Sequence, residues 1–242
     1  MKKIYVVGIG PGNEIFMTNE AKTAIQDSDV IVGYDLYVEL IKELVSGKTV
    51  ESTPMKKEVD RCKIALEYAL KGQTVSMVCS GDAGVYGMAG IMIEVAQENP
   101  EVEIQVVSGI TAACSSAAVL GAPLIHDFAI VSLSDLLTPW EKIEKRLRLA
   151  SDADFVICLY NPSSKKRHDY LKKACEQMLL FKSPDTKCGY VKNIGREGQS
   201  YTLCTLQELK DKEVDMFTTV IVGNSQTKVV NGKLVTPRGY HL

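Results

Sequence analysis

The residues best suited to ligand chemistry lie between Cys79 and Gly90, where four glycines surround one acid, Asp82. Glycine lets the backbone approach a ligand closely, because it has no Cβ atom and tolerates unusual backbone angles. The carboxylate of Asp82 can accept hydrogen bonds from ribose hydroxyls or from backbone N–H groups. The stretch therefore suits a small-molecule site. A tight turn with Asp82 as its cap explains the same residues and stays open.

Other motifs that would carry chemistry are incomplete or missing from the sequence. Gly8–Asn13 resembles a dinucleotide-binding turn, but its sixth position is Asn13, and Pro11 lacks a backbone N–H. No GxxxxGK[ST], GxSxG or HExxH pattern occurs. The three histidines show no metal-ligand spacing, so no metal site is expected.

The elements around Asp82 predict that it lies at the edge of a sheet. The apolar run Thr74–Cys79 predicts a buried strand, and a helix is expected from about Met88. Strand and helix patterns alternate from Ile4 to Leu120, which predicts a mostly parallel sheet with helices on both faces. Ligands bind at the carboxyl ends of the strands in such sheets. The loop that contains Asp82 follows one of these ends.

The alternation restarts in the second half of the chain, with a strand at Ala129–Leu133 and a hairpin around Asn231–Gly232. We therefore expect an α/β protein of two domains, residues 1–111 and 112–242. The first sheet should be mostly parallel and the second mixed, with the active site in a cleft between the domains.

Charged candidates in the second half each have a structural alternative. Asp135 and Ser132 end a strand, but Asp135 also suits a cap for the helix expected at Thr138–Pro139. Lys165–Arg167 is expected at the positive end of a helix, an unfavourable place that hints at an anionic partner. Arg238 lies in a turn-rich tail and suits a structural hydrogen-bond donor equally well.

Composition limits the function classes. The chain has 242 residues, 45% of them hydrophobic, and a net charge of −2. No global basic field therefore argues for nucleic acid. No apolar run is long enough for a membrane span. The seven cysteines form no CxxC pair and are interpreted as buried thiols in a reducing cytoplasm.

Three separated stretches together resemble the tetrapyrrole methylases. These stretches are Gly8–Gly12, Cys79–Gly87 and Val107–Ala112. The resemblance implies an S-adenosylmethionine (SAM)-dependent enzyme of two α/β domains, with S-adenosylhomocysteine as its product and the cofactor between the domains. One departure is Ser108, where the family usually has a proline. Carried over by position, the cofactor contacts are Gly81, Asp82, Val85, Tyr86, Thr111, Ala112, Tyr160 and Gly189.

Further strings are similar to one branch of this family, which methylates C17 of precorrin-3B or cobalt-factor III and contracts the ring in cobalamin synthesis. The longest runs from Ser132 to Trp140, and others include Tyr160–Ser164 and Thr236–Tyr240. The resemblance implies a tetrapyrrole substrate and a homodimer. A sister methylase acting at C11 or C20, and a non-catalytic tetrapyrrole- or nucleotide-binding protein of the same fold, remain alternatives.

The expected chemistry needs few titratable groups. Methyl transfer is an in-line displacement from an activated sulfonium, so the enzyme mainly orients the reactants and excludes water. Asp135 and Ser132 are the candidates to assist ring contraction. Gly10, Pro11 and Gly12 are expected to border the tetrapyrrole. The substrate carboxylates need cations. The candidates are Lys165, Lys166, Arg167, Arg196 and Arg238.

Overall fold

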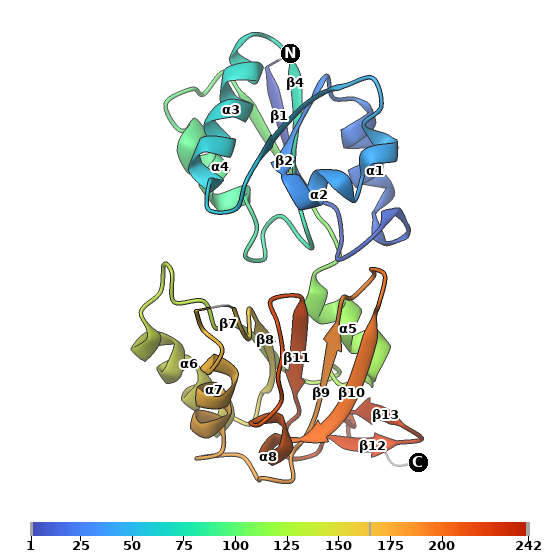
Figure 1. Ribbon diagram of the computed structural model, residues 1–242, viewed down its shortest axis with the longest axis vertical. Coiled ribbons are helices and arrows are strands. Elements are labelled where there is room, and N and C mark those ends of the chain that lie inside the picture. The colour runs from blue at the N-terminus through green and yellow to red at the C-terminus, as the bar shows by residue number, and fades with distance from the viewer. Residues whose placement is uncertain (1, 165, 241–242) are drawn as a thin grey trace. The chain divides into compact units, whose positions relative to one another are not determined.

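A computed structural model describes residues 2–164 and 166–240 of the chain (Figure 1). The chain divides into two compact units, Met1–Thr111 and Ala112–Leu242. Each unit has its own sheet with helices on both faces. Lys165 lies outside the described residues.

Unit 1 is built on a five-stranded parallel sheet in the order β3-β2-β4-β1-β5. Its strands are β1 (Lys3–Gly8), β2 (Val30–Tyr34), β3 (Thr49–Thr53), β4 (Thr74–Cys79) and β5 (Glu103–Val107). Val7 pairs with Val78 on one side and Val107 on the other. Because β1 and β4 are covered on both faces, they read as continuous apolar runs.

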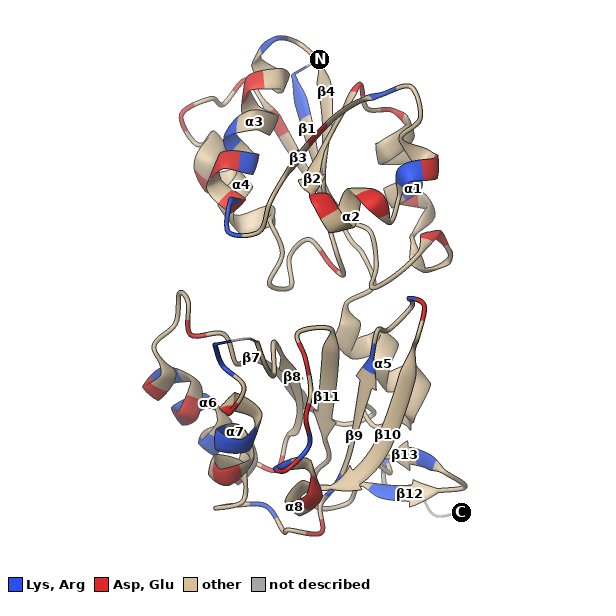
Figure 2. Ribbon diagram, in the orientation of Figure 1, with Lys and Arg blue, Asp and Glu red and all other residues tan. Residues whose placement is uncertain are grey.

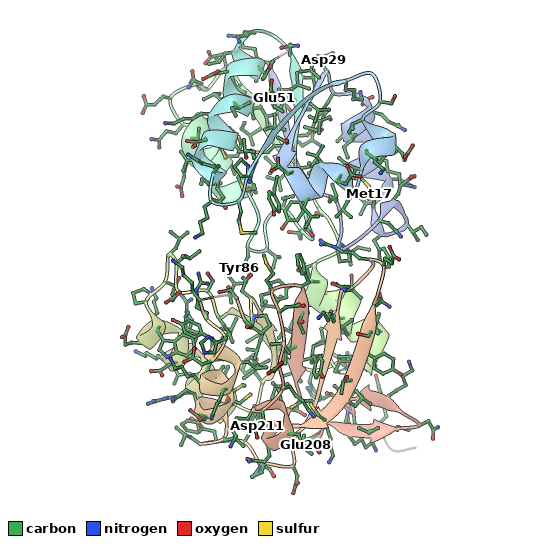
Figure 3. The ribbon with its side chains drawn as sticks, viewed as in Figure 1. Met17, Asp29, Glu51, Tyr86, Glu208 and Asp211 are labelled. Atoms are coloured by element: carbon green, nitrogen blue, oxygen red, sulfur yellow. The ribbon has the colours of Figure 1, made fainter. Side chains whose placement is uncertain are left out.

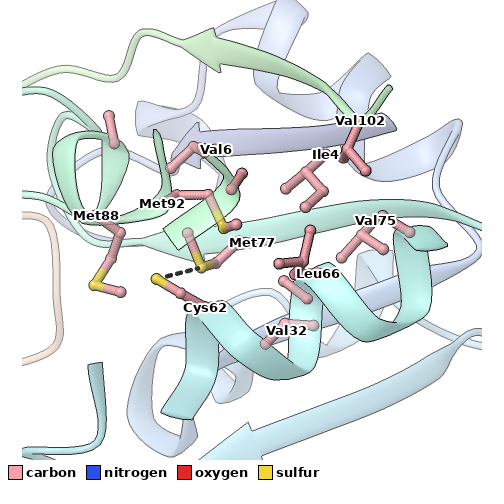
Figure 4. Close-up of a cluster of buried hydrophobic side chains, with 14 of the residues drawn as sticks. Ile4, Val6, Val32, Cys62, Leu66, Val75, Met77, Met88, Met92 and Val102 are labelled. Carbon is pink, nitrogen blue, oxygen red and sulfur yellow. Dashed lines mark hydrogen bonds between the residues drawn. The ribbon is translucent and has the colours of Figure 1, made fainter. Parts of the chain in front are cut away.

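Helices cover both faces of this sheet. α3 (Glu58–Leu70) and α4 (Ala89–Ala96) lie on one face, where Leu66, Met77 and Met92 are buried together (Figure 4). α1 (Asn19–Gln26) lies on the other face, and the side chain of Thr18 caps it by accepting a hydrogen bond from the Ala21 N–H. Apolar helical faces account for this three-layer arrangement.

The segment between β2 and β3 does not form one continuous helix. α2 ends after one turn (Asp35–Glu39), and a 3₁₀ turn follows at Lys42–Leu44. Ile41 and Val45, on either side of that turn, are both buried against the core.

Unit 2 has a mixed sheet in the order β10-β9-β11-β8-β7. β7 (Phe128–Ser132) and β8 (Val156–Tyr160) are parallel, whereas β11 (Thr218–Val222) runs antiparallel to both β8 and β9 (Lys187–Lys192). β10 (Ser200–Thr205) runs antiparallel to β9. The expected α/β class, with one parallel and one mixed sheet, is confirmed.

Small residues pack α5 (Ala112–Leu120) closely onto one face of this sheet. The opposite face carries α6 (Trp140–Asp152), α7 (Tyr170–Met178) and α8 (Leu206–Leu209). A Cβ atom at Gly189 would lie 2.8 Å from Cδ2 of Leu120, so glycine in β9 permits this close contact.

Two helix starts differ from the expectation. The sequence predicts a helix start at Thr138–Pro139, but α6 begins at Trp140 with Pro139 as its N-cap, because Pro139 keeps an extended backbone with ψ 142°. α7 begins at Tyr170, because Ser164 and Arg167 close a separate turn by reciprocal backbone hydrogen bonds of 3.3 and 2.9 Å. Lys166 and Arg167 thus precede the helix. Their place in the chain therefore no longer indicates an unfavourable contact with the helix dipole or, through it, an anionic partner.

The expected hairpin is present. β12 (Lys228–Val230) and β13 (Lys233–Val235) are joined by Asn231 and Gly232, whose φ angles of 49° and 73° suit a type I′ turn. β13 also pairs with β6 (Gly121–Ala122), a two-residue strand that the sequence did not predict.

None of the described helices has the length and apolar character needed to cross a membrane. Both basic and acidic residues occur on α1, α3, α6 and α7, whereas α5 carries neither (Figure 2).

Candidate functional site

Three loops meet at the carboxyl edge of the unit 1 sheet, after β1, β4 and β5. Gly8, Gly81 and Gly109 bring their backbones together: a Cβ on Gly8 would lie 2.7 Å from both the Gly109 nitrogen and the Gly81 oxygen. Gly10 and Gly81 exchange backbone hydrogen bonds of 3.0 and 2.7 Å. The loops therefore form one connected backbone surface at the edge where α/β sheets bind ligands.

Asp82 ties two of these loops together. Its Oδ1 accepts hydrogen bonds from the N–H groups of Gly84 (2.8 Å) and Val85 (3.1 Å), and its Oδ2 accepts one from Gly109 (2.9 Å). It does not cap α4, whose N-cap is Met88. Oδ1 thus uses both of its acceptor positions, whereas Oδ2 has one further position to which a ligand hydroxyl can donate.

Other residues expected at the cofactor lie on the same loops. Tyr86, after β4, has a left-handed backbone (φ 54°) and a side chain that is 59% exposed (Figure 3). Thr111 follows β5 and is half-buried. Gly10, Pro11 and Gly12 are buried, and Gly10 has φ 76° with the Phe16 carbonyl where a Cβ would lie. Loop backbone, rather than ionised side chains, forms most of this surface.

The parallel strands of unit 2 also end at one edge. The phenolic oxygen of Tyr160, at the end of β8, accepts a hydrogen bond of 2.7 Å from the Ala113 N–H in the first turn of α5. Ser132, at the end of β7, accepts hydrogen bonds from Nδ2 of Asn161 (2.9 Å) and from the Ser134 N–H (3.3 Å). These contacts fix the strand ends and the start of α5, which includes Ala112, relative to one another.

Asp135 lies at this edge in a network of its own. It pairs with Nε of Arg167 at 3.0 Å and accepts a hydrogen bond of 2.6 Å from the Tyr170 hydroxyl. The pKa of Tyr170 is raised, chiefly by that hydrogen bond and secondarily by burial. Arg167 also donates to the Ser134 hydroxyl at 3.2 Å. The capping role considered for Asp135 is wrong, because the N-cap of α6 is Pro139 and no side chain makes a cap hydrogen bond to this helix.

The expected cation set is divided. Lys166 is exposed beside Arg167, and the Arg196 guanidinium lies 5.5 Å from the centre of the Phe217 ring in the loop after β9. Arg238 lies two residues beyond Thr236, whose hydroxyl shares a hydrogen bond of 2.8 Å with that of Thr227, at the opposite edge of the sheet. The structure therefore brings Lys166, Arg167 and Arg196 to one edge but not Arg238.

The described residues offer no cluster of His, Cys, Asp or Glu that could hold a metal ion. The seven cysteines are free thiols. Burial raises the pKa of Cys79, beside the Asp82 loop, to about 11, so this thiol stays protonated and unreactive at neutral pH. The arrangement suits binding and orientation better than nucleophilic catalysis.

One candidate residue escaped the sequence analysis. Arg61 is buried in α3 and lines a pocket in unit 1, together with Tyr34 and Tyr86. Its position could have been noticed, since Arg61 precedes the inward-facing Ala65 and Ala69 by one and two helical turns.

The family model for Tetrapyrrole (Corrin/Porphyrin) Methylases matches residues 3–210. The chain belongs to the tetrapyrrole methylase family. Its SAM loop candidates, Gly81 and Asp82, and the Gly10–Gly12 turn all fall within the matched range.

Curated relatives resemble the chain over almost its whole length. It is 47% identical to the "Probable cobalt-factor III C(17)-methyltransferase" of Salmonella typhimurium, over 98% of this chain and 99% of that protein. It is 51% identical to the "Cobalamin biosynthesis protein CbiHC" of Archaeoglobus fulgidus, over 98% of this chain, and spans about half (53%) of that longer protein.

A solved structure is also similar. The crystal structure of the methyltransferase CobJ matches with a TM-score of 0.90 and 37% identity, covering 97% of this chain and 99% of that one. The match includes both α/β units in one chain. The predicted family resemblance is thus confirmed at the levels of sequence and fold.

The close approach of the three loops makes a test possible. We expect Gly109→Ala to destabilise the protein by about 1–3 kcal/mol, because its Cβ would overlap the Gly81 carbonyl and the Gly8 backbone. Gly90→Ala is the matched control: it lies in α4, has open space where a Cβ would lie and should stabilise by about 0.5–1 kcal/mol. Equal urea midpoints for both variants would contradict the loop packing.

Proposed function

We propose that the chain is a SAM-dependent C-methyltransferase that methylates C17 of cobalt-factor III or precorrin-3B, with contraction of the macrocycle, in cobalamin biosynthesis. The observation that carries the proposal is the end-to-end similarity to the Salmonella protein, named for this reaction. The fold match to the methyltransferase CobJ supports the methyltransferase part of the proposal.

The cofactor assignment follows from the family and from the loops of unit 1. SAM supplies an activated methyl group on a sulfonium. We assign its binding to Gly81, Asp82, Val85, Tyr86 and Thr111, with Ala112, Tyr160 and Gly189 from unit 2. The loop backbone and Asp82 would hold the ribose and adenine, while Tyr160 would keep the start of α5 in place. Orientation and exclusion of water account for the rate.

For the macrocycle, we propose Gly10, Pro11 and Gly12 as one border and Lys166, Arg167 and Arg196 as partners of its acetate and propionate groups. Arg167 is already paired with Asp135, which offsets its positive charge. It would therefore act mainly by orienting a substrate carboxylate through its N–H groups. Arg238 is the weaker candidate for binding a substrate carboxylate, because Thr236 anchors its segment at the opposite edge of the sheet.

The protein is also proposed to work as a homodimer in the cytoplasm. Leu136 and Leu137, 59% and 98% exposed, offer apolar surface for a partner copy. Seven free cysteines suit a reducing compartment. The proposed dimer would be contradicted if light scattering at micromolar concentration gave only the mass of the monomer.

The central experiment is anaerobic incubation with SAM and, separately, cobalt-factor III and precorrin-3B. We expect a product one methyl group heavier, with the absorption change that accompanies ring contraction. Methylation without contraction, or at C11 or C20 by fragment analysis, would favour a sister methylase. Binding without any methyl transfer from labelled SAM would favour the non-catalytic alternative.

Asp82→Asn tests the cofactor assignment. The amide keeps one acceptor oxygen for the Gly84 and Val85 N–H groups, but turns a donor toward the Gly109 N–H. We expect S-adenosylhomocysteine affinity, measured by calorimetry, to fall about tenfold or more, as for loss of a charged hydrogen bond. Asp60→Asn, an exposed acid on α3, is the control. Unchanged affinity in Asp82→Asn would remove Asp82 from the site.

Asp135→Asn tests assistance to ring contraction, for which Asp135 and Ser132 are our candidates. We expect methylated but uncontracted product to accumulate, because the amide cannot exchange a proton as a carboxylate does. Tyr170→Phe is the control, since it removes the 2.6 Å hydrogen bond and leaves the carboxylate. If Asp135→Asn forms contracted product at the wild-type rate, Asp135 only positions Arg167, and Ser132→Ala becomes the remaining test.

A further inference from the structure

Arg61 is a buried cation whose partners among the described residues are all neutral. It is the only arginine among the first 111 residues and is 4% exposed. Its Nε donates to the Thr53 hydroxyl (2.9 Å), its Nη2 to the Pro54 carbonyl (3.3 Å), and its Nη1 contacts the Met88 sulfur (3.8 Å). No ion pair between residues in the described ranges includes Arg61.

These contacts leave binding capacity on the guanidinium. Arginine carries five N–H donors, and the three contacts use one on each nitrogen, so one donor remains on each of Nη1 and Nη2. A buried charge without a counter-ion is costly. The start of α3 adds positive potential, because Arg61 lies in the helix's first turns. The two spare donors match the two oxygens of a carboxylate.

A pocket of about 170 Å³ opens beside this group in unit 1. It is smaller than the roughly 300 Å³ of the smallest sites for whole ligands. It therefore suits one substituent of a larger molecule. Tyr34 and Tyr37, packed edge to face at 5.0 Å, form part of the lining and offer ring surface to a planar neighbour.

The pocket lies beside the proposed cofactor loop. Its lining includes Ser80, Tyr86 and Gly87 from the loop after β4, and Glu58 from the start of α3. Glu58 is exposed, so solvent screens its charge more than that of the buried Arg61. A ligand held by the Asp82 loop could reach Arg61 with a flexible side group.

We propose that Arg61 and this pocket bind a single carboxylate of a ligand held at the Asp82 loop. The inference rests on the proposed function, which supplies two sources of that carboxylate. One source is an acetate or propionate group of the tetrapyrrole, and the other is the methionine carboxylate of SAM. Arg61 acts as a binding residue that fixes the position of the ligand.

Arg61→Met, Arg61→Lys and the control Lys63→Met test the proposal. Lys63 is exposed on the same helix, so its variant removes one positive charge and leaves the pocket intact. The probes are uroporphyrin III, which carries both acetate and propionate groups, titrated by absorbance without SAM, and S-adenosylhomocysteine, titrated by calorimetry. The thermal midpoint of each ligand-free variant is measured alongside.

We expect Arg61→Met to weaken one probe about 10- to 100-fold, as for loss of a charged hydrogen bond. A loss confined to uroporphyrin III assigns the tetrapyrrole carboxylate, and a loss confined to S-adenosylhomocysteine assigns the methionine carboxylate. Arg61→Lys should weaken the same probe less, because it keeps the charge but not the planar fork. Lys63→Met should leave both affinities unchanged.

The opposing outcomes are distinct. Wild-type affinity for both probes in Arg61→Met, or a wild-type protein that binds neither, overturns the proposal. If Arg61→Met does not fold, Arg61→Lys decides: a lowered thermal midpoint with wild-type affinities makes Arg61 a structural link between β3 and α4. The proposed function is judged separately by methyl transfer in the wild-type protein, so it can fail while Arg61 still binds a carboxylate.

Discussion

The close approach of three backbone segments, at Gly8, Gly81 and Gly109, is the constraint on which the site depends. Side chains at Gly8 or Gly109 would overlap neighbouring backbone atoms. The same contact lets the carboxylate of Asp82 reach the Gly109 N–H across the loops. Parallel strands bring the loops to one edge of the sheet, and the glycines let them touch. The packing of these three loops therefore determines the shape of the candidate cofactor loop before any ligand binds.

In this arrangement most of the hydrogen-bonding groups at the site belong to the backbone. Asp82 is satisfied by three N–H groups, and Cys79 is held protonated by burial. Such a site has little acid or base to offer, which suits transfer of an already activated methyl group. The proposed ring contraction needs proton movement, and the candidate for it in unit 2 is the carboxylate of Asp135, which contacts Arg167 and Tyr170. Under the proposed function, the two units would therefore supply different chemistry.

Periodicity predicted the elements well where one apolar pattern dominates. β4 has the bounds expected from the sequence, Thr74–Cys79, because an apolar run of this length leaves few alternatives to a buried strand. The starts of α6 and α7 were misplaced, because they depend on local detail. Pro139 takes the cap position itself, and a closed turn at Ser164–Arg167 delays α7. Such hydrogen bonds have no signature in hydrophobic spacing.

The candidate site can be predicted from the sequence where its residues are neighbours in the chain. Gly81, Asp82, Val85 and Tyr86 lie in one loop, so a short motif singles them out, and their contact with the cofactor stays a prediction. The neighbours of Arg61 come from Thr53, Pro54 and Met88, brought together only by the packing of α3 against the sheet and α4. The apolar stripe of α3 marks the buried face but not a cation within it. A charged residue on such a stripe must find its partners from distant segments or from a ligand. For Arg61 the described part of the chain supplies only neutral ones.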